Sequence, residues 1–155
     1  MTVTLREITM DSFRECIKLT VAETQKGFVA SNMYSLAEAQ ADGVSHPRAI
    51  YADERMVGFI MFDFEPKEDR GYISRLMIAE KHQRNGYGRE AMQQVIDEFK
   101  RNTACKEIQT AVVPENVAAA ALYRSLGFEP TGEMDEGEAV LRMPINRTPH
   151  QSLGL

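Results

Sequence analysis

The sequence has only two cysteines and no long run of hydrophobic residues. Cys16 and Cys105 lie far apart and lack the short spacing of metal-binding pairs, so we expect reduced thiols, with neither a disulfide framework nor a metal site. Nowhere do about 18 consecutive apolar residues occur, the length that a helix needs to cross a bilayer. The opening MTVTLREITM also lacks the basic and apolar regions of an export signal. We therefore expect a soluble, cytoplasmic protein without a membrane partner.

Positive charge is scarce as well. The chain has 18 Lys and Arg against 23 Asp and Glu, which gives a formal net charge of −5. Domains that bind nucleic acid usually carry a basic surface, so this balance argues against nucleic acid as a partner. It mildly favours a cationic ligand, and solubility alone is the other explanation of an acidic surface.

What the chain does have is enough apolar material for one compact domain. It has 155 residues, of which 43% are hydrophobic, a composition that suits a single core. Alternating or continuous apolar runs predict strands over 3–8, 48–52, 56–64, 71–78, 107–113 and 138–145. Helical spacing predicts helices from Asp11, from a capping box at Ser35–Glu38, over the stretch from Ala91 to Phe99, and over Ala118–Leu126.

This order of elements predicts a mixed α/β architecture with one central sheet. Residues 22–34 follow neither period and are expected to form a loop or a broken helix. We expect one domain over residues 1–145 and a flexible tail over residues 146–155, where periodicity is lost.

Two glycines and two arginines stand directly before the third predicted helix, in HQRNGYGRE. The first N–H groups of a helix lack partners and its dipole is positive there, so such a turn suits a phosphate. Gly86 and Gly88 would let the phosphate approach the backbone, and Arg84 and Arg89 would add charge-assisted bonds. A turn that merely connects strand and helix is the alternative. The sequence lacks the Gly-Lys-Ser/Thr of a P-loop and the third glycine of a dinucleotide site.

A second motif makes the interpretation more specific. The strand Leu76–Ile78 followed by Gln83, Arg84, Gly86 and Gly88 resembles the acetyl-CoA signature Q/R-x-x-G-x-G/A of the GCN5-related N-acetyltransferase (GNAT) family. The later segment ENVAAAALYRSLGF, residues 115–128, is similar to the family pattern N-x-x-A-x-x-L-Y-x-x-x-G-F. The resemblance in element order covers residues 3–145. It implies the GNAT-type fold, a mixed central sheet of about six to seven strands flanked by about four helices.

The resemblance also implies acetyl-CoA as co-substrate and no metal. The pantetheine arm would lie along the strand before the turn and bond its backbone like an added strand. Asn116 would cap the next helix, bond the coenzyme, or do both. The implied coenzyme-binding residues are Met77, Ile78, Gln83, Arg84, Asn85, Gly86, Tyr87, Gly88, Arg89 and Asn116.

Acyl transfer to an amine requires a neutral amine, a stabilised oxyanion and often a proton for the departing thiolate. Tyr123 matches the family tyrosine that is thought to protonate the thiolate, and a phenol with a pKa near 10 is protonated at neutral pH. Packing of the ring in the core is the alternative role. By analogy with the family, the oxyanion would meet the backbone N–H of Ile78 or of its neighbour.

The general base is not assigned by the sequence. Ser74 and Arg75 stand where some relatives carry an acidic residue. Glu23 and Glu80 remain as carboxylates, each with a solvated surface position as the alternative. The three histidines are no better candidates for the general base. They are His46, His82 and His150.

The segment 21–39, here called the acceptor loop, resembles that of the bacterial diamine/polyamine (spermine/spermidine) N-acetyltransferases. This resemblance implies direct attack by a polyamine, held by ion pairs and cation–π contacts, with Glu23, Gln25, Phe28 and Tyr34 as substrate-binding residues. Phe28 and Tyr34 could instead cap the sheet. Other acceptors, namely an aminoglycoside, an amino acid or a protein N-terminus, stay open, as does a non-catalytic acyl-CoA sensor. Family members often pair through edge strands, which makes a homodimer one expected assembly.

Overall fold

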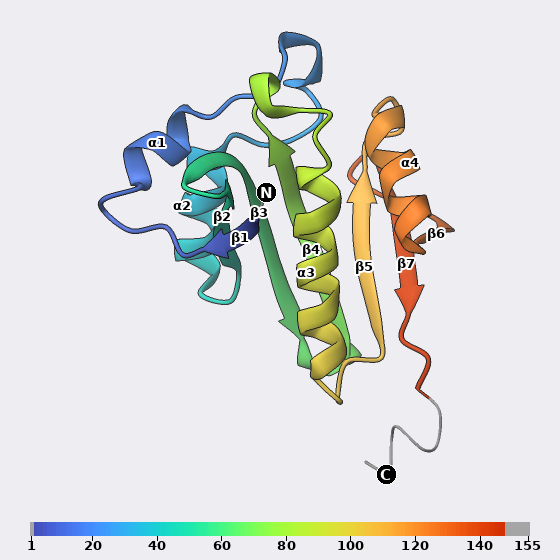
Figure 1. Cartoon of the computed structure of the whole chain (residues 1–155). Helices are drawn as coiled ribbons and strands as arrows, with labels where there is room; N and C mark the ends of the chain where they lie inside the picture. Colours follow the sequence, from blue (N-terminus) through green and yellow to red (C-terminus); the bar gives the residue numbers. More distant parts are fainter. Residues whose placement is uncertain (1, 148–155) are drawn as a thin grey trace.

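Over residues 2–147, which are those that the structure describes, the computed structural model is a seven-stranded mixed sheet with helices on both faces (Figure 1). The strands are β1 Val3–Arg6, β2 His46–Ala52, β3 Arg55–Glu65, β4 Arg70–Ile78, β5 Glu107–Val112, β6 Glu129–Asp135 and β7 Glu138–Pro144. The helices are α1 Phe13–Lys18, α2 Asn32–Asp42, α3 Tyr87–Arg101 and α4 Val117–Leu126, with short 3-10 helices η1 Glu23–Gln25, η2 Pro66–Glu68 and η3 Glu80–His82.

The strand order is β1-β2-β3-β4-β5-β7-β6, and every described pair is antiparallel except β4 with β5. The parallel pair needs a crossover connection, which α3 supplies across one face of the sheet. Figure 1 shows α3 and α4 on this face, with the blue α1 and cyan α2 at the other end of the molecule. The predicted α/β class and the single central sheet are confirmed.

Two apolar clusters cover the two faces of the sheet. The larger lies under α3 and α4 and includes the apolar stripe predicted for the third helix, since Ala91, Met92, Val95, Ile96 and Phe99 are all buried. The smaller lies under α1 and α2 and includes Cys16, Phe59 and Met77. Each helix pair therefore fixes one face of β3 and β4, the strands that lead to the glycine turn.

The start of α2 differs from the prediction. The helix begins at Asn32 because the Ser31 side chain caps it by accepting a bond from the Tyr34 N–H at 3.1 Å. Ser35 lies inside the helix and its hydroxyl donates to the Ser31 carbonyl. The Ser-x-x-Glu pattern of Ser35–Glu38 thus lies one turn after the true start of the helix. Ser31, which is also a favoured N-cap residue, sets that start.

The strand β6 was not predicted. It is an edge strand whose residues are exposed except for the half-buried Thr131, so it has no apolar alternation. Pro130 and a register shift between Pro130 and Met134 interrupt its pairing with β7. Proline, charge and irregular register are typical of edge strands, and they conceal such strands from a search for periodicity.

Part of the predicted tail is described. Arg147 donates hydrogen bonds to the carbonyls of Cys105, Lys100 and Asn102. The rest of that prediction, residues 148–155, and with it His150, lies outside the described residues.

Both cysteines are buried and free, and burial raises the pKa of Cys16 to about 11. Between residues 2 and 147 no group of three or more His, Cys, Asp or Glu side chains could hold a metal ion. In the same part of the chain, no helix combines the length and apolar character that crossing a membrane requires.

Candidate active site

The parallel strands β4 and β5 separate halfway along their length. They pair only from Arg70 opposite Glu107 to Ile73 opposite Thr110, and the Thr110 hydroxyl donates to the Ile73 carbonyl at 2.9 Å. Figure 1 shows the two strands diverging toward their carboxyl ends. Beyond Ile73, the edge of β4 that faces β5 has no strand partner in the described part of the chain, so its backbone can accept an extended ligand.

A bulge occurs at the same level of β4. Met61 pairs with Arg75 and Phe62 pairs with Ile73, which leaves Ser74 as an extra residue on β4. The Ser74 hydroxyl bonds the Met61 carbonyl at 3.3 Å. A bulge bends its strand and increases the twist, so this one accounts for the divergence of β4 from β5.

The glycine turn joins the end of β4 to α3. Gly86 is the N-cap of α3 at a φ of 80°, a conformation that side chains disfavour, and Arg84 shares this region at 67°. The Asn85 side chain donates to the His82 and Gln83 carbonyls and so closes the turn. The first helical bond runs from the Glu90 N–H to the Gly86 carbonyl. The positive end of the α3 dipole therefore points to the opening of the sheet.

Two glutamines connect the turn to the acceptor loop. The Gln83 amide donates to the Ile78 carbonyl at 2.9 Å and to the Gln25 amide oxygen at 2.8 Å. The Gln25 amide oxygen also accepts a bond from the Ala22 N–H. The sequence predicts that Gln25 binds the substrate and that Gln83 binds the coenzyme. In the structure the two side chains are hydrogen-bonded to each other. The two amides hold η1 and the turn together.

Helices α3 and α4 begin beyond the carboxyl ends of the two parallel strands, where ligands bind in open α/β sheets. The Asn116 side chain caps α4 by accepting a bond from the Ala119 N–H at 3.3 Å, so its capping role is confirmed. The Arg89 guanidinium of α3 donates to the Ser125 hydroxyl of α4. A Cβ on Gly88 would lie 3.7 Å from both Ile78 and Leu122, which places this glycine between β4 and α4.

Tyr123 of α4 combines a packed ring with an unpaired hydroxyl. The residue is only 6% exposed, and its ring meets Phe128 edge-on at a centroid distance of 6.1 Å. No residue among those described hydrogen-bonds the hydroxyl. Burial, with a smaller effect from the Glu138 carboxylate, raises the pKa of Tyr123 far above its ordinary value. The group therefore keeps its proton at neutral pH and has it available to donate.

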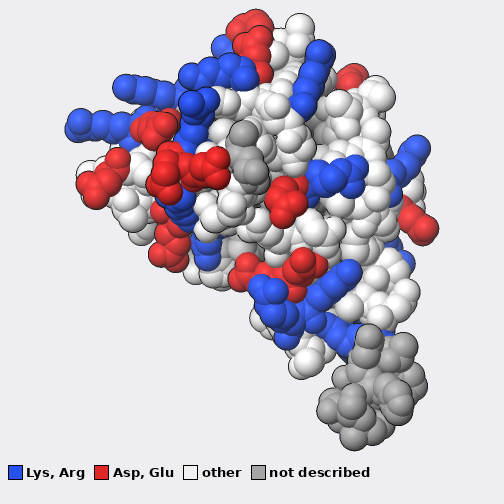
Figure 2. Space-filling model, in the orientation of Figure 1, with Lys and Arg blue, Asp and Glu red and all other residues white. Residues whose placement is uncertain are grey.

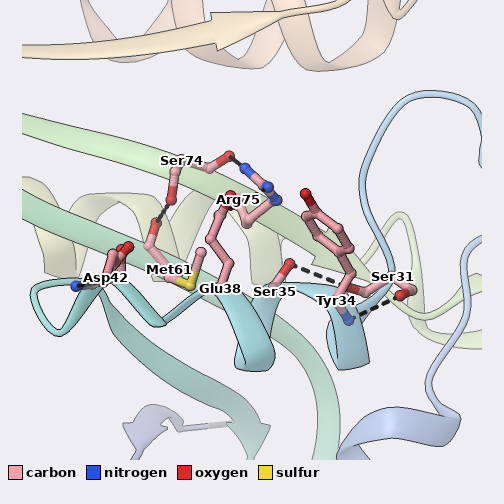
Figure 3. Close-up of polar contacts among 9 residues, drawn as sticks. Ser31, Tyr34, Ser35, Glu38, Asp42, Met61, Ser74 and Arg75 are labelled. Atoms are coloured by element: carbon pink, nitrogen blue, oxygen red, sulfur yellow. Dashed lines mark hydrogen bonds and ion pairs between the residues drawn. The ribbon is translucent and has the colours of Figure 1, made fainter. Parts of the chain in front are cut away.

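The acceptor side is formed by α2 and β4. Figure 3 shows Tyr34 and Glu38 of α2 beside Arg75 of β4, and the Glu38 carboxylate pairs with Arg75 at 3.1 Å. Tyr34 is 60% exposed, and Phe28 is half-buried in the loop before α2. Glu23 extends into solvent and pairs with Lys26. Sequence reasoning missed Glu38, although it lies one helical turn after Tyr34, the spacing that places side chains on one face.

A second carboxylate on this side of the sheet, that of Asp63 on β3, is half-buried and has no hydrogen-bond or ion-pair partner among the described residues. Its pKa is raised to about 6, mainly by burial and then by the charges of Glu65 and Asp42, which His46 and Arg70 partly oppose. Its opposite residue on β4 is Tyr72. Neither residue has a sequence signal of its own, because polar residues at strand ends are ordinary.

We expect Asp63→Asn to stabilise the protein at pH 8 and not at pH 4. The folded carboxyl binds its proton more tightly than the unfolded one, whose pKa is 3.8, so its ionisation lowers stability as the pH rises from about 3.8 through about 6, and the loss is complete above that pH. With allowance for solvent screening, the gain at pH 8 is about 1 kcal/mol, or about 3 °C in Tm. Thermal unfolding at both pH values measures it, with the exposed Asp11→Asn as the control. Equal shifts at the two pH values would contradict the assignment.

Charged side chains of both signs are interspersed over the face that α3 and α4 cover (Figure 2). A depression of about 420 Å³ borders the turn on this side, lined by Asn85, Gly86, Tyr87, Glu90 and the start of β1. The turn is thus accessible from the surface, as a binding site for a phosphate must be.

Comparison with known proteins agrees with this geometry. Residues 4–128 match the model of the acetyltransferase (GNAT) family. A spermine/spermidine N(1)-acetyltransferase of Bacillus subtilis is 27% identical over 148 residues, which cover 91% of this chain and 97% of that protein.

Solved structures share the fold. A spermidine N-acetyltransferase from Vibrio cholerae, in complex with CoA and spermine, has a TM-score of 0.72 at 20% identity, covering 92% of this chain and 94% of that one. A ribosomal L7/L12 alpha-N-protein acetyltransferase in complex with CoA has a TM-score of 0.74 at 17% identity, covering 94% and 95%. Since the family model covers most of the chain, and an open strand edge and a phosphate-type turn stand where its signature predicts them, the chain belongs to the GNAT family and is an acetyl-CoA-dependent N-acetyltransferase.

Proposed function

We propose that this enzyme transfers the acetyl group to a primary amine of a polyamine such as spermidine or spermine, by direct attack of the amine on the thioester. The observation that carries the proposal is the extent of similarity to the Bacillus subtilis spermine/spermidine enzyme. The match covers 91% of the chain. The residues left outside the match are fewer than those of the acceptor loop, residues 21–39, so at least part of that loop is matched. The similarity therefore reaches into the acceptor side of the molecule and is not confined to the coenzyme motifs.

For the coenzyme, we propose that the pantetheine arm bonds the open edge of β4 at Met77 and Ile78. The turn from Gln83 to Arg89 would hold the pyrophosphate, with Gly86 allowing close approach and Arg84 and Arg89 adding charge. Asn85 would keep the turn closed, as its two bonds within the turn suggest. Tyr87, Gly88 and Asn116 complete the proposed set.

The Gln25 amide supports a positioning role rather than a direct contact with the amine, since it is occupied by Gln83 and Ala22. A coenzyme that orders the turn would thereby order η1 and the start of the acceptor loop. We propose Phe28 and Tyr34 as apolar and cation–π contacts for the methylene and ammonium groups of the acceptor, with Glu23 as a peripheral anion.

A protein N-terminus is the second candidate acceptor. The fold is as similar to the alpha-N-protein acetyltransferase as to the spermidine enzyme, with TM-scores of 0.74 and 0.72. Arg75 adds a positive charge on the acceptor side, which suits a peptide carbonyl better than a second ammonium group.

The test is release of the CoA thiol from acetyl-CoA with a panel of amines: spermidine, spermine, putrescine, an aminoglycoside, free amino acids and a short peptide. We expect kcat/KM for spermidine and spermine to exceed that of every other amine in the panel. Preference for another amine would refute the polyamine acceptor, and tight acetyl-CoA binding without release would favour a sensor.

We also propose that the enzyme is cytoplasmic, because acetyl-CoA is supplied in that compartment. We expect it to have no nucleic-acid or membrane partner. Pairing through an edge strand would make it a homodimer, and β1 and β6 are the edges of the described sheet. Light scattering on the purified chain distinguishes a dimer from a monomer.

A further inference from the structure

Glu138 stands at the end of the sheet toward which β4 and β5 diverge. Glu138 is the first residue of β7, next to Ala139, which pairs with Val112 at the end of β5. Ala139 and Leu141 pack in the core under α3 and α4, and side chains alternate along a strand. Glu138 therefore lies on the other face of the sheet, the face on which Arg75 pairs with α2.

Glu138 nevertheless acts on a residue from the opposite face. Its charge raises the pKa of Tyr123, which belongs to α4, and it is the strongest charge acting on Tyr72 of β4. Paired strands would separate a carboxylate on one face of the sheet from a hydroxyl on the other. Beyond Ile73 and Thr110 the strands β4 and β5 are no longer paired, so the two groups can interact across the sheet there. Glu138 and Tyr123 are therefore within electrostatic range of each other although they belong to opposite faces of the sheet.

The Glu138 carboxylate, like that of Asp63, lacks a partner among residues 2–147. Glu38, Glu65 and Glu107 are each paired with an arginine, whereas the half-buried carboxylate of Glu138 makes no ion pair or hydrogen bond with any residue from 2 to 147. A buried charge without a partner is costly in a fold that gains nothing from it. The Tyr123 hydroxyl, on which its charge acts, also has no hydrogen-bond partner in this part of the chain.

We propose that Glu138 is the general base of the reaction, which binds the ammonium group of the acceptor and takes its proton. The inference depends on Tyr123 as the proposed proton donor but not on a polyamine as the acceptor. A primary amine of pKa near 10 is almost entirely protonated at neutral pH, so a base must act before attack.

The protons balance as follows. One proton passes from the ammonium group to Glu138, and the freed nitrogen lone pair forms the C–N bond at the thioester carbonyl. When the C–S bond breaks, the thiolate takes a proton from Tyr123. The nitrogen releases its second proton, which restores the Tyr123 hydroxyl, and Glu138 returns its proton to solvent.

Other carboxylates fit this role less well. Glu38 is paired with Arg75 (Figure 3), and Glu23 is paired with Lys26 at the surface. Glu80 is exposed on η3. Asp63 lies opposite Tyr72, on the part of β4 that is still paired with β5.

Several charges tune the Glu138 carboxylate. Burial raises its pKa, Asp135 and Glu136 of the β6–β7 hairpin raise it too, and Arg75 of β4 opposes them. The tyrosines whose pKa its charge raises are Tyr72 and Tyr123. A carboxyl with a raised pKa is a stronger base than an ordinary one, and the Arg75 charge limits the rise.

The test is the pH dependence of kcat/KM for Glu138→Gln, with whichever amine of the panel the wild-type enzyme uses best. For wild type, kcat/KM should stay level between the pKa of Glu138 and that of the amine, and fall as the pH drops below the former. The variant can use only the neutral amine, which is about one part in a thousand at pH 7 for a pKa near 10. Its kcat/KM should therefore be about a thousandfold lower at pH 7 and rise tenfold per pH unit toward the pKa of the amine. The KM for acetyl-CoA should not change.

Two further variants keep the outcome unambiguous. Glu138→Asp retains a carboxylate and should keep a level profile, while the exposed Glu133→Gln on β6 makes the same change of charge elsewhere and should behave as wild type. A loss that is equal at every pH, or no loss, would overturn the assignment of Glu138 as the base. Because the amine is chosen by activity, a failure of the polyamine proposal leaves this test intact.

Discussion

Replacing Tyr123 by phenylalanine is expected to lower kcat about 100-fold and to leave the affinity for acetyl-CoA unchanged. A positioned proton donor contributes about 10²–10⁴ to the rate of such a step, and phenylalanine removes only the donor. The ring would still pack edge-on against Phe128. Because no described residue bonds the hydroxyl, its loss leaves no polar group unpaired, and Tm should not fall. Steady-state kinetics, acetyl-CoA titration and thermal unfolding measure the three quantities.

The control for this substitution is Tyr51→Phe. Tyr51 is a half-buried tyrosine of β2 whose ring lies under the Arg6 guanidinium, remote from the open edge of β4. It should keep wild-type kcat. If Tyr123→Phe also kept wild-type kcat, the hydroxyl would not be the donor, and the thiolate would leave unprotonated or take its proton from water.

Much of this site could be predicted because its signals are local. The hydrophobic strand 71–78, the glycine turn and the apolar stripe of α3 are each contained in a few consecutive residues, and the structure has all three where the sequence predicted them. The capping role of Asn116 is local too, since its bond reaches only to Ala119. Short-range geometry of this kind is fixed by propensity and periodicity.

The parts that sequence reasoning missed depend on pairings between distant segments. Gln25 meets Gln83 only because the loop before α2 folds over the end of β4. Glu138 stands at the end of the sheet toward which β4 and β5 diverge only because β7 inserts between β5 and β6, and β6 itself was not predicted. In the sequence, Glu138 stands in the acidic run MDEGE, which is indistinguishable from a solvated hairpin.

Gly58 is another residue whose importance only the structure shows. In the sequence it is one small residue within the apolar run of β3, but in the sheet it lies opposite Ile78 of β4. A Cβ at this position would lie 2.4 Å from the Met77 carbonyl oxygen and 2.8 Å from the Ile78 side chain. The carbonyl is backbone and cannot rotate away, so a methyl group here must push β4 away from β3, at the two residues proposed to bond the pantetheine arm.

Gly58→Ala is therefore expected to weaken acetyl-CoA binding at least tenfold and to cost about 2 kcal/mol of stability, or about 6 °C in Tm, which is typical of overpacking. Calorimetric titration with acetyl-CoA well below the Tm of the variant separates the two effects. Gly27→Ala is the control, because a Cβ there would meet no atom within 4 Å, and it should change neither quantity. A lower Tm with unchanged affinity would show that the coenzyme does not bond this part of β4, since displacement of Met77 and Ile78 would then not affect binding.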